Sequence, residues 1–485
     1  MGNRFLVTVL GLGAALCATT SQAQSLPSPI AAVARPAGPT LPSGQALELT
    51  LDEAVALALR YNRQVRSSYL QRVVQRFDLR VAERAFIPRG EVGAEVAQRR
   101  IDGRVDDEIS TQASASWLTP LGGQVGFIWS RSDARQGDGY EAAGVSLVQP
   151  LLRGGGLAVN MAPVRIARLQ EDINRLQLEA TLSGTITSVI TSYRNLVQAQ
   201  EQVRLAEASL ERMRELLATN RALIDAGRMA ETDIVQTESA VANQEVALLQ
   251  ARQQLTSAQL ALVQLLALAS RTNVVAVDDM QAARVDVDLE RALDTAFSSR
   301  IDLLAQQIAL EQTRQSLIMA RNARLWDVSL VASATRDDGY RFWRRDDRTD
   351  TSVGLRLTIP LGDLSRQQNW LSAQTHMQTA ELAFEELKQS VESQVLDAVQ
   401  SVDASWHRVE AARRAKQLSE QALEIAQEKL RFGRASNFEV LSLQADLRAA
   451  DAQALAANIS YLNALTALDQ QIGSTLRTWR ISLNE

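Results

Sequence analysis

Residues 146–156 read SLVQPLLRGGG, and the character of the sequence changes across them. Upstream, Val145 and Leu147 alternate with small or polar residues, as in a strand that is apolar on one face. Proline cannot donate to a strand ladder, so we expect Pro150 to end this strand. Three glycines then allow a sharp turn into a helix, at Gly154, Gly155 and Gly156. A phosphate-binding loop is disfavoured, because the Lys-Ser/Thr pair of such loops does not follow.

Long tracts after this junction are typical of helices. There is no proline between Pro163 and Pro360 or after Pro360, and an interior proline costs a helix about 3 kcal/mol. Apolar residues recur every three or four positions, close to coiled-coil spacing, at Phe384, Leu387, Val391, Val395, Val399, Val402, Trp406 and Val409. Two helices of roughly 100 Å are predicted over 157–226 and 365–432, at about 1.5 Å per residue. Medium and short helices are predicted over 228–268, 434–472, 51–86 and 289–325.

The islands between these tracts alternate at period two, which indicates strands with one apolar face. Examples are Val125, Phe127 and Trp129 in the first half, and Val353, Leu355, Leu357 and Ile359 in the second. Aromatic residues gather in or beside the islands, at Trp117, Trp129, Tyr140, Trp326, Tyr340 and Trp343. Aromatic residues ring both interfaces of an outer-membrane barrel, although soluble β-hairpins would show the same alternation.

The two halves of the chain repeat each other. Leu51-Asp52-Glu53-Ala54 matches Leu289-Glu290-Arg291-Ala292 at an offset of 238 residues. GVSLVQPL, from Gly144, matches GLRLTIPL, from Gly354, so a second strand-to-helix junction is expected at Pro360. AGRMAETDIVQTESA matches FGRASNFEVLSLQAD, which places a helical turn at Gly227-Arg228 and another at Gly433-Arg434. A repeat that covers most of the chain has to be recognised before a fold is assigned.

These patterns divide the chain into a signal peptide (1–23), a proline-rich extension (24–48), repeat 1 (49–270), a linker (271–286), repeat 2 (287–473) and a C-terminal tail (474–485). Small residues at Ser21 and Ala23 predict cleavage after Ala23. Leu16 precedes the single cysteine, Cys17, where a lipid-anchored cysteine needs a small residue, so no lipid anchor is expected. No later stretch offers about eighteen consecutive apolar residues. An exported chain of this kind is periplasmic, secreted or an outer-membrane β-barrel.

In the order, spacing and duplication of its motifs, the chain resembles the TolC-type outer-membrane efflux channels over roughly residues 49–473. The motifs are LTLDEAVALAL, LVQPLLRGGG, Pro360-Leu361-Gly362 and RFGRASNFEVLSLQADL. The resemblance implies a long α-helical coiled-coil barrel in the periplasm, joined to a transmembrane antiparallel β-barrel that three chains share. It also implies a homotrimer that contacts outer-membrane lipid, a periplasmic adaptor protein and an inner-membrane pump.

The strand count supports an oligomer without the resemblance. One chain offers only about four to six strands, and a closed membrane barrel needs about eight or more. Residues 113–131 look like an additional hairpin that the second repeat lacks, and the simplest family pattern lacks it too. The barrel could then have 18 strands instead of 12, or the hairpin could lie outside it.

The resemblance also suggests where function lies. The periplasmic entrance of the family is narrowed by acidic side chains just past each glycine turn, and by position these are Asp233 and Glu439. A carboxylate ring would favour cations, although exposed acids on helices are common and need have no such role. The tips that meet the adaptor correspond to Gly227, Arg228, Gly433 and Arg434, whose glycines would equally serve as helix C-caps.

The leading interpretation is a passive trimeric outer-membrane channel that completes a tripartite efflux system for small molecules. A type I protein-secretion duct is a second possibility, and a periplasmic coiled-coil scaffold or adaptor is a third of another class. Neither enzyme activity nor a cofactor is expected, because His376 and His407 lack partners at metal-ligand spacing and no nucleophile motif occurs. A formal net charge of −5 gives no basic footprint for nucleic acid.

Overall fold

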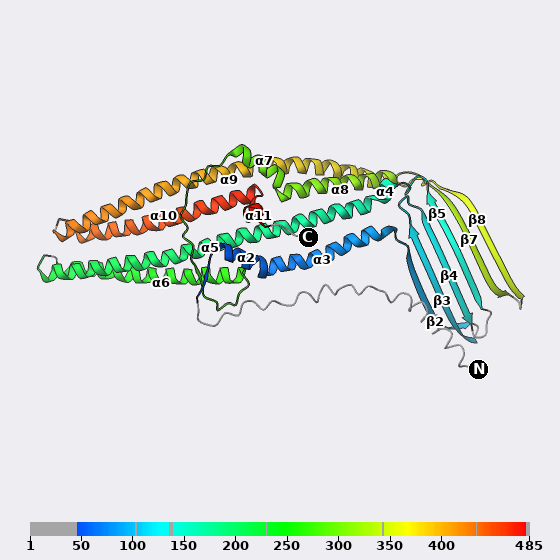
Figure 1. Ribbon diagram of the computed structural model, residues 1–485, viewed down its shortest axis with the longest axis horizontal. Helices are drawn as coiled ribbons and strands as arrows, with labels where there is room; N and C mark the ends of the chain where they lie inside the picture. The colour runs from blue at the N-terminus through cyan, green and yellow to red at the C-terminus, as the bar shows by residue number, and fades with distance from the viewer. Residues whose placement is uncertain are drawn as a thin grey trace.

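The structure is a computed structural model that describes residues 46–481, except 102, 103, 135–138, 229, 342, 343 and 433. The predicted signal peptide, Cys17, Gly433 and Trp343 therefore lie outside the described residues. Long helices run side by side, with an antiparallel sheet at one end and two helix–turn–helix tips at the other (Figure 1). Among the described residues, no helix combines the length and apolar character that a membrane span requires.

Strand β1 (Leu47–Leu49) comes first. Repeat 1 then contains α2 (Leu51–Tyr61), α3 (Arg63–Glu83), the 3₁₀ turn η1 (Arg84–Phe86), β2 (Arg89–Ile101), β3 (Arg104–Leu118), β4 (Gln124–Ala134), β5 (Tyr140–Pro150), α4 (Leu157–Asn160), α5 (Ala162–Asp225), the 3₁₀ turn η2 (Glu231–Asp233) and α6 (Ile234–Leu265). The linker holds β6 (Val274–Ala276). Repeat 2 contains α7 (Leu289–Ser299), α8 (Ile301–Ala323), β7 (Asp327–Arg341), β8 (Arg344–Thr358), α9 (Ser365–Arg431) and α10 (Asn437–Gln471), and α11 (Thr475–Thr478) follows. Leu47 and Glu48, predicted to belong to an unpacked extension, are part of β1, which pairs in parallel with β6.

The two short helices are each broken in two, where the sequence predicts single helices over 51–86 and 289–325. The breaks fall at Asn62 and Arg300, which are equivalent under the same offset of 238 residues and both have extended backbone conformations. The Asn62 amide donates to the carbonyl of Leu265, at the end of α6, over 2.8 Å. The Arg300 guanidinium donates to the side chain of Gln471, at the end of α10, over 3.0 Å. Each break is therefore the point where a medium helix stacks end to end on a short one.

The first long helix begins later than predicted. A separate four-residue helix, α4, precedes it, and α5 starts at Ala162 with Pro163 in its first turn. Pro163 has no N–H to donate to the preceding turn, so one continuous helix from residue 157 would leave a gap in its hydrogen bonding there. The second long helix, predicted over 365–432, is observed as α9.

The large sheet has six strands in the order β2-β3-β4-β5-β7-β8, and every neighbouring pair is antiparallel. Four strands come from repeat 1 and two from repeat 2, so the additional hairpin predicted over 113–131 is an integral part of this sheet. Strands β2 and β8 form its two edges.

The two faces of the sheet differ in polarity. One row across the strands contains Trp117, Val125, Leu147, Ala332 and Val353 in register. The adjacent row, whose side chains point to the opposite face, contains Ser116, Gly126, Ser146, Ser333 and Ser352. An apolar outer face with a polar inner face is the pattern of a membrane barrel.

The helices form a single curved layer rather than a bundle with a closed core. Near the sheet, α3 packs against α5, α5 against α8, and α8 against α9. Near the tips, α6 packs against α5, α5 against α10, and α10 against α9. Within the described chain, α3 and α6 therefore form one edge of the layer and α9 forms the other.

The main core lies at mid-height, where α2, α5, α6 and the β1–β6 pair meet. Tyr193 is fully buried there, and its hydroxyl bonds to the carbonyl of Leu49 over 2.8 Å and to the Asp278 carboxylate over 2.9 Å. Burial raises the pKa of Tyr193 to about 12, so this hydroxyl stays protonated at physiological pH. The hydrogen bonds of Tyr193 tie the linker and the N-terminal strand to α5.

An ion pair joins α3 to α5 between this core and the sheet. Removing the ion pair tests how much the contact between these two helices contributes to stability. The Arg72 guanidinium makes a bidentate contact of 2.5 and 2.8 Å with Glu171, and the two side chains are only 11% and 18% exposed. The hydrogen bond from Arg72 lowers the pKa of Glu171 below its usual range. We expect Arg72→Gln to reduce the free energy of unfolding by about 1–3 kcal/mol at pH 7.

Because the pKa of Glu171 is lower in the folded state, the stabilisation is complete above the ordinary carboxyl value and is lost as the pH falls through the folded value. Urea unfolding of the two proteins should therefore differ at pH 7, and the difference should shrink once the pH falls below the ordinary carboxyl value of about 4.3. Arg214→Gln is the matched control, since the pair of Arg214 with Glu245 is about half exposed and should contribute under about 1 kcal/mol. Equal losses in the two variants would contradict this expectation.

Candidate functional site

The predicted strand-to-helix junction is built around Pro150, the last residue of β5. Two backbone bonds continue the pairing just beyond it, from Leu151 to Val328 over 2.8 Å and from Arg153 to Trp326 over 3.2 Å. Arg153 also pairs with Asp327 over 2.6 Å. The chain is therefore held to β7 for a short distance after the strand ends.

The three glycines then reverse the chain as predicted. Gly154 and Gly156 have φ angles of 79° and 98°, in the region that favours glycine. Two asparagines brace the turn: Asn322 accepts from the backbone N–H of Gly154 over 2.7 Å, and Asn160 donates to the carbonyl of Gly154 over 2.8 Å. At the second junction, Pro360 follows β8, and Gly362 has a φ of 72°.

A second Pro-Leu-Gly turn, Pro120-Leu121-Gly122, joins β3 to β4 within the predicted hairpin, and its likeness to Pro360-Leu361-Gly362 was missed in the sequence. Gly122 has a φ of 90°, as Gly362 has a positive φ after Pro360-Leu361. The β3–β4 turn docks on the first junction, since the N–H of Gly156 donates to the carbonyl of Leu121 over 3.1 Å. Comparing LTPLGG with LTIPLGD in the sequence would have revealed it.

The two tips have the same helix-ending geometry. After α5, the N–H of Arg228 donates to the carbonyl of Leu223 over 2.8 Å, and Gly227 has a φ of 69°. After α9, the N–H of Arg434 donates to the carbonyl of Lys429 over 2.8 Å. This is the hydrogen bond that defines a Schellman cap. Arg228 and Arg434 are exposed, and neither forms an ion pair within the described parts of the chain.

The two candidate constriction residues lie just beyond the caps. Asp233 is the last residue of η2, directly before α6. Glu439 is exposed in the first turn of α10, where its backbone N–H bonds to the Ser436 hydroxyl over 3.1 Å. Asp233 therefore directly precedes its returning helix and Glu439 lies in the first turn of the other, both at the end of the molecule opposite the sheet (Figure 1).

A buried polar cluster links these two turns to each other. Asn220, on α5, donates to Thr237, on α6, and to Asn437, on α10, over 2.8 Å each. Asn437 also donates to Thr237 over 3.0 Å. The three side chains are between 0% and 6% exposed. The cluster was not foreseen, and it fixes the turn that carries Asp233 beside the turn that carries Glu439.

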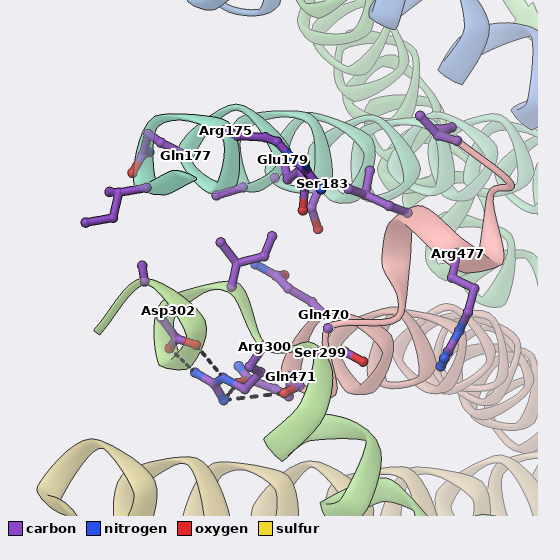
Figure 2. Close-up of a pocket in the computed structure, with 18 of the residues that line it drawn as sticks. Arg175, Gln177, Glu179, Ser183, Ser299, Arg300, Asp302, Gln470, Gln471 and Arg477 are labelled. Atoms are coloured by element: carbon purple, nitrogen blue, oxygen red, sulfur yellow. Dashed lines mark hydrogen bonds and ion pairs between the residues drawn. The ribbon is translucent and has the colours of Figure 1, made fainter. Parts of the chain in front are cut away.

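A cleft lies at mid-height beside the Arg300 break (Figure 2). Two ion pairs line it, Arg300 with Asp302 over 2.6 Å and Arg175 with Glu179 over 3.5 Å, and Arg477 and Arg480 line it as well. Arg300 also lowers the pKa of Asp302 by hydrogen bonding to it. The cleft therefore belongs to the joint between α8 and α10.

The histidines lie apart on α9. His407 is 62% exposed and contacts Glu410 over 3.2 Å, and His376 is exposed. Over the described residues, no group of three or more histidine, cysteine or acidic side chains is placed to hold a metal ion.

Comparison with known proteins agrees with this architecture. The model of the outer membrane efflux protein family matches residues 94–268 and 279–474. The chain belongs to the outer membrane efflux protein family. It is therefore an efflux channel of the outer membrane, with its sheet in the membrane and its helices in the periplasm.

Two curated relatives have related roles. The outer membrane efflux protein BepC of Brucella suis is 24% identical over 353 residues, covering 71% of this chain and 74% of BepC. The pyoverdine export outer membrane protein OpmQ of Pseudomonas putida is 24% identical over 312 residues, covering 62% of this chain and 64% of OpmQ.

Solved structures share the fold of this efflux protein. The Campylobacter jejuni CmeC outer membrane channel aligns with a TM-score of 0.68 at 15% identity, covering 88% of this chain and 86% of CmeC. The Vibrio cholerae outer membrane protein VceC aligns with a TM-score of 0.68 at 16% identity, covering 87% of this chain and 96% of VceC. The predicted fold class, a helical tube joined to an antiparallel barrel with two internal repeats, is confirmed.

Proposed function

We propose that three copies of this chain close into one passive conduit, which exports small molecules together with a periplasmic adaptor and an inner-membrane pump. The observation that carries the proposal is the open sheet. An edge strand with unpaired N–H and C=O groups cannot face lipid, because the membrane offers no hydrogen-bond partners. Strands β2 and β8 must therefore pair with something.

A second copy of the chain fits these edges. Six strands with antiparallel neighbours leave β8 antiparallel to β2, so pairing β8 with the β2 of another copy continues the alternation. Such a contact joins different surfaces of the two copies and repeats until a ring closes. Three copies would give a barrel of about 18 strands, within the range of membrane barrels.

The helices support the same assembly. The α3 edge exposes a stripe of large apolar residues, Tyr69, Leu70, Val73, Val74, Phe77 and Val81. The α9 edge exposes Leu371 and Leu382, which are 57% and 71% exposed. Apolar stripes of this size on helices that should stand in water indicate surfaces that are buried in the assembly.

The tips are the proposed contact with the adaptor. Phe432 and Phe438 flank the second tip and are 69% and 73% exposed, beside Arg434. Gly227 and Arg228 form the other tip, with Val235 64% exposed after it. Exposed aromatic residues and arginine are enriched where proteins bind one another. Asp233 and Glu439, just inside these tips, are the proposed constriction.

The alternatives fit less well. A periplasmic scaffold or adaptor has no use for a sheet with a lipid-compatible outer face. A type I secretion duct would have the same architecture, because the cargo is chosen by the pump. The names of the relatives BepC, an efflux protein, and OpmQ, a pyoverdine export protein, favour the export of small molecules.

Disulfide cross-linking tests whether α3 of one copy lies beside α9 of the next copy in a closed ring. Phe77 and Leu371 lie at the same distance from the sheet, on α3 and α9. If Ala23 ends the signal peptide, the mature chain has no cysteine of its own. We expect Phe77→Cys/Leu371→Cys to form, on oxidation, a ladder of covalent dimers and trimers on a denaturing gel.

The matched control pairs Phe77→Cys with Leu418→Cys, which is also exposed on α9 but lies much farther from the sheet. This pair should stay monomeric. A ladder that stops at dimers, or that continues beyond trimers, would overturn the proposed stoichiometry.

A further inference from the structure

The apolar outer face of the strands is too short to cross a membrane by itself. On β4 the outward apolar run extends from Val125 to Trp129, and Arg131 comes next. On β7 it extends from Val328 to Ala334, and Arg336 comes next. These runs span about five and seven residues, whereas a tilted transmembrane strand needs about 9–11.

Residues beyond the strand ends make up the difference. On β4, β5, β7 and β8 the outward row reaches about nine residues if it is extended towards the helices as far as Leu121 before β4, Leu151 after β5, Trp326 before β7 and Leu361 after β8. Gln149 is the one polar side chain in these four rows. Leu151 and Trp326 keep the outward register, because the backbone bonds at Leu151 and Arg153 continue the β5–β7 ladder. Three of these four residues directly follow a proline that ends a strand or opens a turn.

These residues are exposed in the single chain. Leu121, Leu151 and Trp326 are 53%, 54% and 56% exposed. They lie at strands β3 to β7, away from the sheet edges, so a second copy pairing at β2 or β8 does not cover them. Their surface is continuous with the apolar face of the strands, which lipid covers in an outer-membrane barrel.

Leu121, Leu151 and Trp326 together form an exposed apolar collar. Arginines that lack acidic partners lie next to this collar, on the side of the helices. Arg84 is in η1, between α3 and β2, and Arg321 and Arg324 are at the end of α8. In the part of the chain that the structure describes, none of the three forms an ion pair. The guanidinium of Arg324 stacks 4.2 Å from the ring centre of Trp370, which leaves its N–H edge free for an anion.

The acids at this level are already paired. Glu83 binds Arg168 over 3.0 Å, Asp327 binds Arg153 over 2.6 Å, and Asp363 lies 3.7 Å from Arg366. The level of Arg84, Arg321 and Arg324 therefore has an excess of positive charge next to the apolar collar. Phospholipid presents the complementary order, with acyl chains followed by a phosphate.

We propose that the membrane boundary lies on the helical side of the strand ends. Acyl chains of the periplasmic leaflet cover the Leu121, Leu151 and Trp326 collar, and anionic phospholipid headgroups bind Arg84, Arg321 and Arg324. This inference rests on the outer-membrane location of the protein and does not depend on how many copies form the ring.

The first test measures depth in the bilayer. Leu121→Cys and Leu151→Cys are labelled separately with a fluorophore in the full-length protein, which is reconstituted into phosphatidylcholine vesicles. Quenching by brominated acyl chains, with little quenching by iodide, is expected at both. A label at Leu418→Cys, on the exposed face of α9, should show the reverse. Quenching by iodide alone at Leu121 and Leu151 would overturn the proposed boundary.

The second test concerns the headgroup. Wild-type protein and Arg84→Gln/Arg321→Gln/Arg324→Gln are reconstituted into mixed phosphatidylglycerol and phosphatidylcholine, re-extracted, and analysed for bound lipid by mass spectrometry. We expect a several-fold enrichment of phosphatidylglycerol on the wild type and its loss in the triple variant. Arg214→Gln/Arg221→Gln/Arg252→Gln removes the same charge from the exposed tube and should retain the enrichment. Equal enrichment in all three proteins would overturn the headgroup site.

Discussion

Gly122→Ala is expected to abolish assembly of the channel in the membrane. A β-carbon at Gly122 would overlap the carbonyl oxygen of Gly154 and lie 2.7 Å from the Asn160 amide nitrogen. Neither group can retreat, because Asn160 donates to that same carbonyl over 2.8 Å. The φ of 90° adds the strain of an L-residue in the left-handed region, about 1–2 kcal/mol. The β3–β4 hairpin should therefore fail to dock, which removes two strands from the middle of the sheet.

The measurement is the yield of folded, heat-resistant oligomer in isolated outer membranes. Gly156→Ala separates the two causes, since Gly156 has a φ of 98° but open space around it. That variant should assemble with reduced stability. Gly184→Ala, in α5, meets neither obstacle and should assemble as the wild type does. Normal assembly of Gly122→Ala would show that the hairpin does not need to dock on the junction.

Asp233→Ala/Glu439→Ala should convert a cation-preferring channel into one with little charge preference. If three copies close the tube, each contributes two carboxylates from the first turns after the tips, and a narrow ring of like charge concentrates cations. In planar bilayers we expect the ratio of cation to anion permeability to fall several-fold towards unity. Conductance should also rise, because alanine is smaller than either acid.

The control removes two acids from elsewhere on the tube. Glu215, on α5, and Glu424, on α9, are exposed, so Glu215→Ala/Glu424→Ala changes the net charge equally without altering the tips. This control should keep the preference for cations. If both double variants lose selectivity to the same extent, the effect comes from overall charge, and the constriction lies elsewhere.

Much of the fold could be predicted because it depends on local signals. A stretch without proline or interior glycine allowed one uninterrupted helix, and α9 is observed over nearly the range expected. The duplicated motifs predicted a turn at the end of each long helix, and the described residues show α5 and α9 ending there. The breaks at Asn62 and Arg300 were missed because they depend on partners far along the chain, at the ends of α6 and α10. Arg300 gives no local signal of a break, whereas Asn62 is a favoured N-cap residue and caps α3 by accepting from the N–H groups of Gln64 and Val65.

The elements that escaped prediction are short or depend on tertiary contacts. Strands β1 and β6 have three residues each and pair across the whole length of repeat 1, so no periodicity could reveal them. The cluster of Asn220, Thr237 and Asn437 joins three helices whose exposed polar positions look alike in sequence. The roles assigned to Asp233, Glu439 and the tips stay predictions, because one chain does not show the closed ring.

The additional hairpin, β3–β4, affects the perimeter of the channel. Near the sheet each chain contributes four neighbouring helices, which at roughly 9 Å apart cover an arc of about 36 Å. Six strands spaced about 4.8 Å apart and tilted by about 40° cover about 37 Å, whereas four would cover only about 25 Å. The sheet and the helical layer therefore have matching perimeters, so the duct meets the membrane without a taper. A transported molecule that passes the periplasmic end should therefore meet no second constriction where the channel enters the outer membrane.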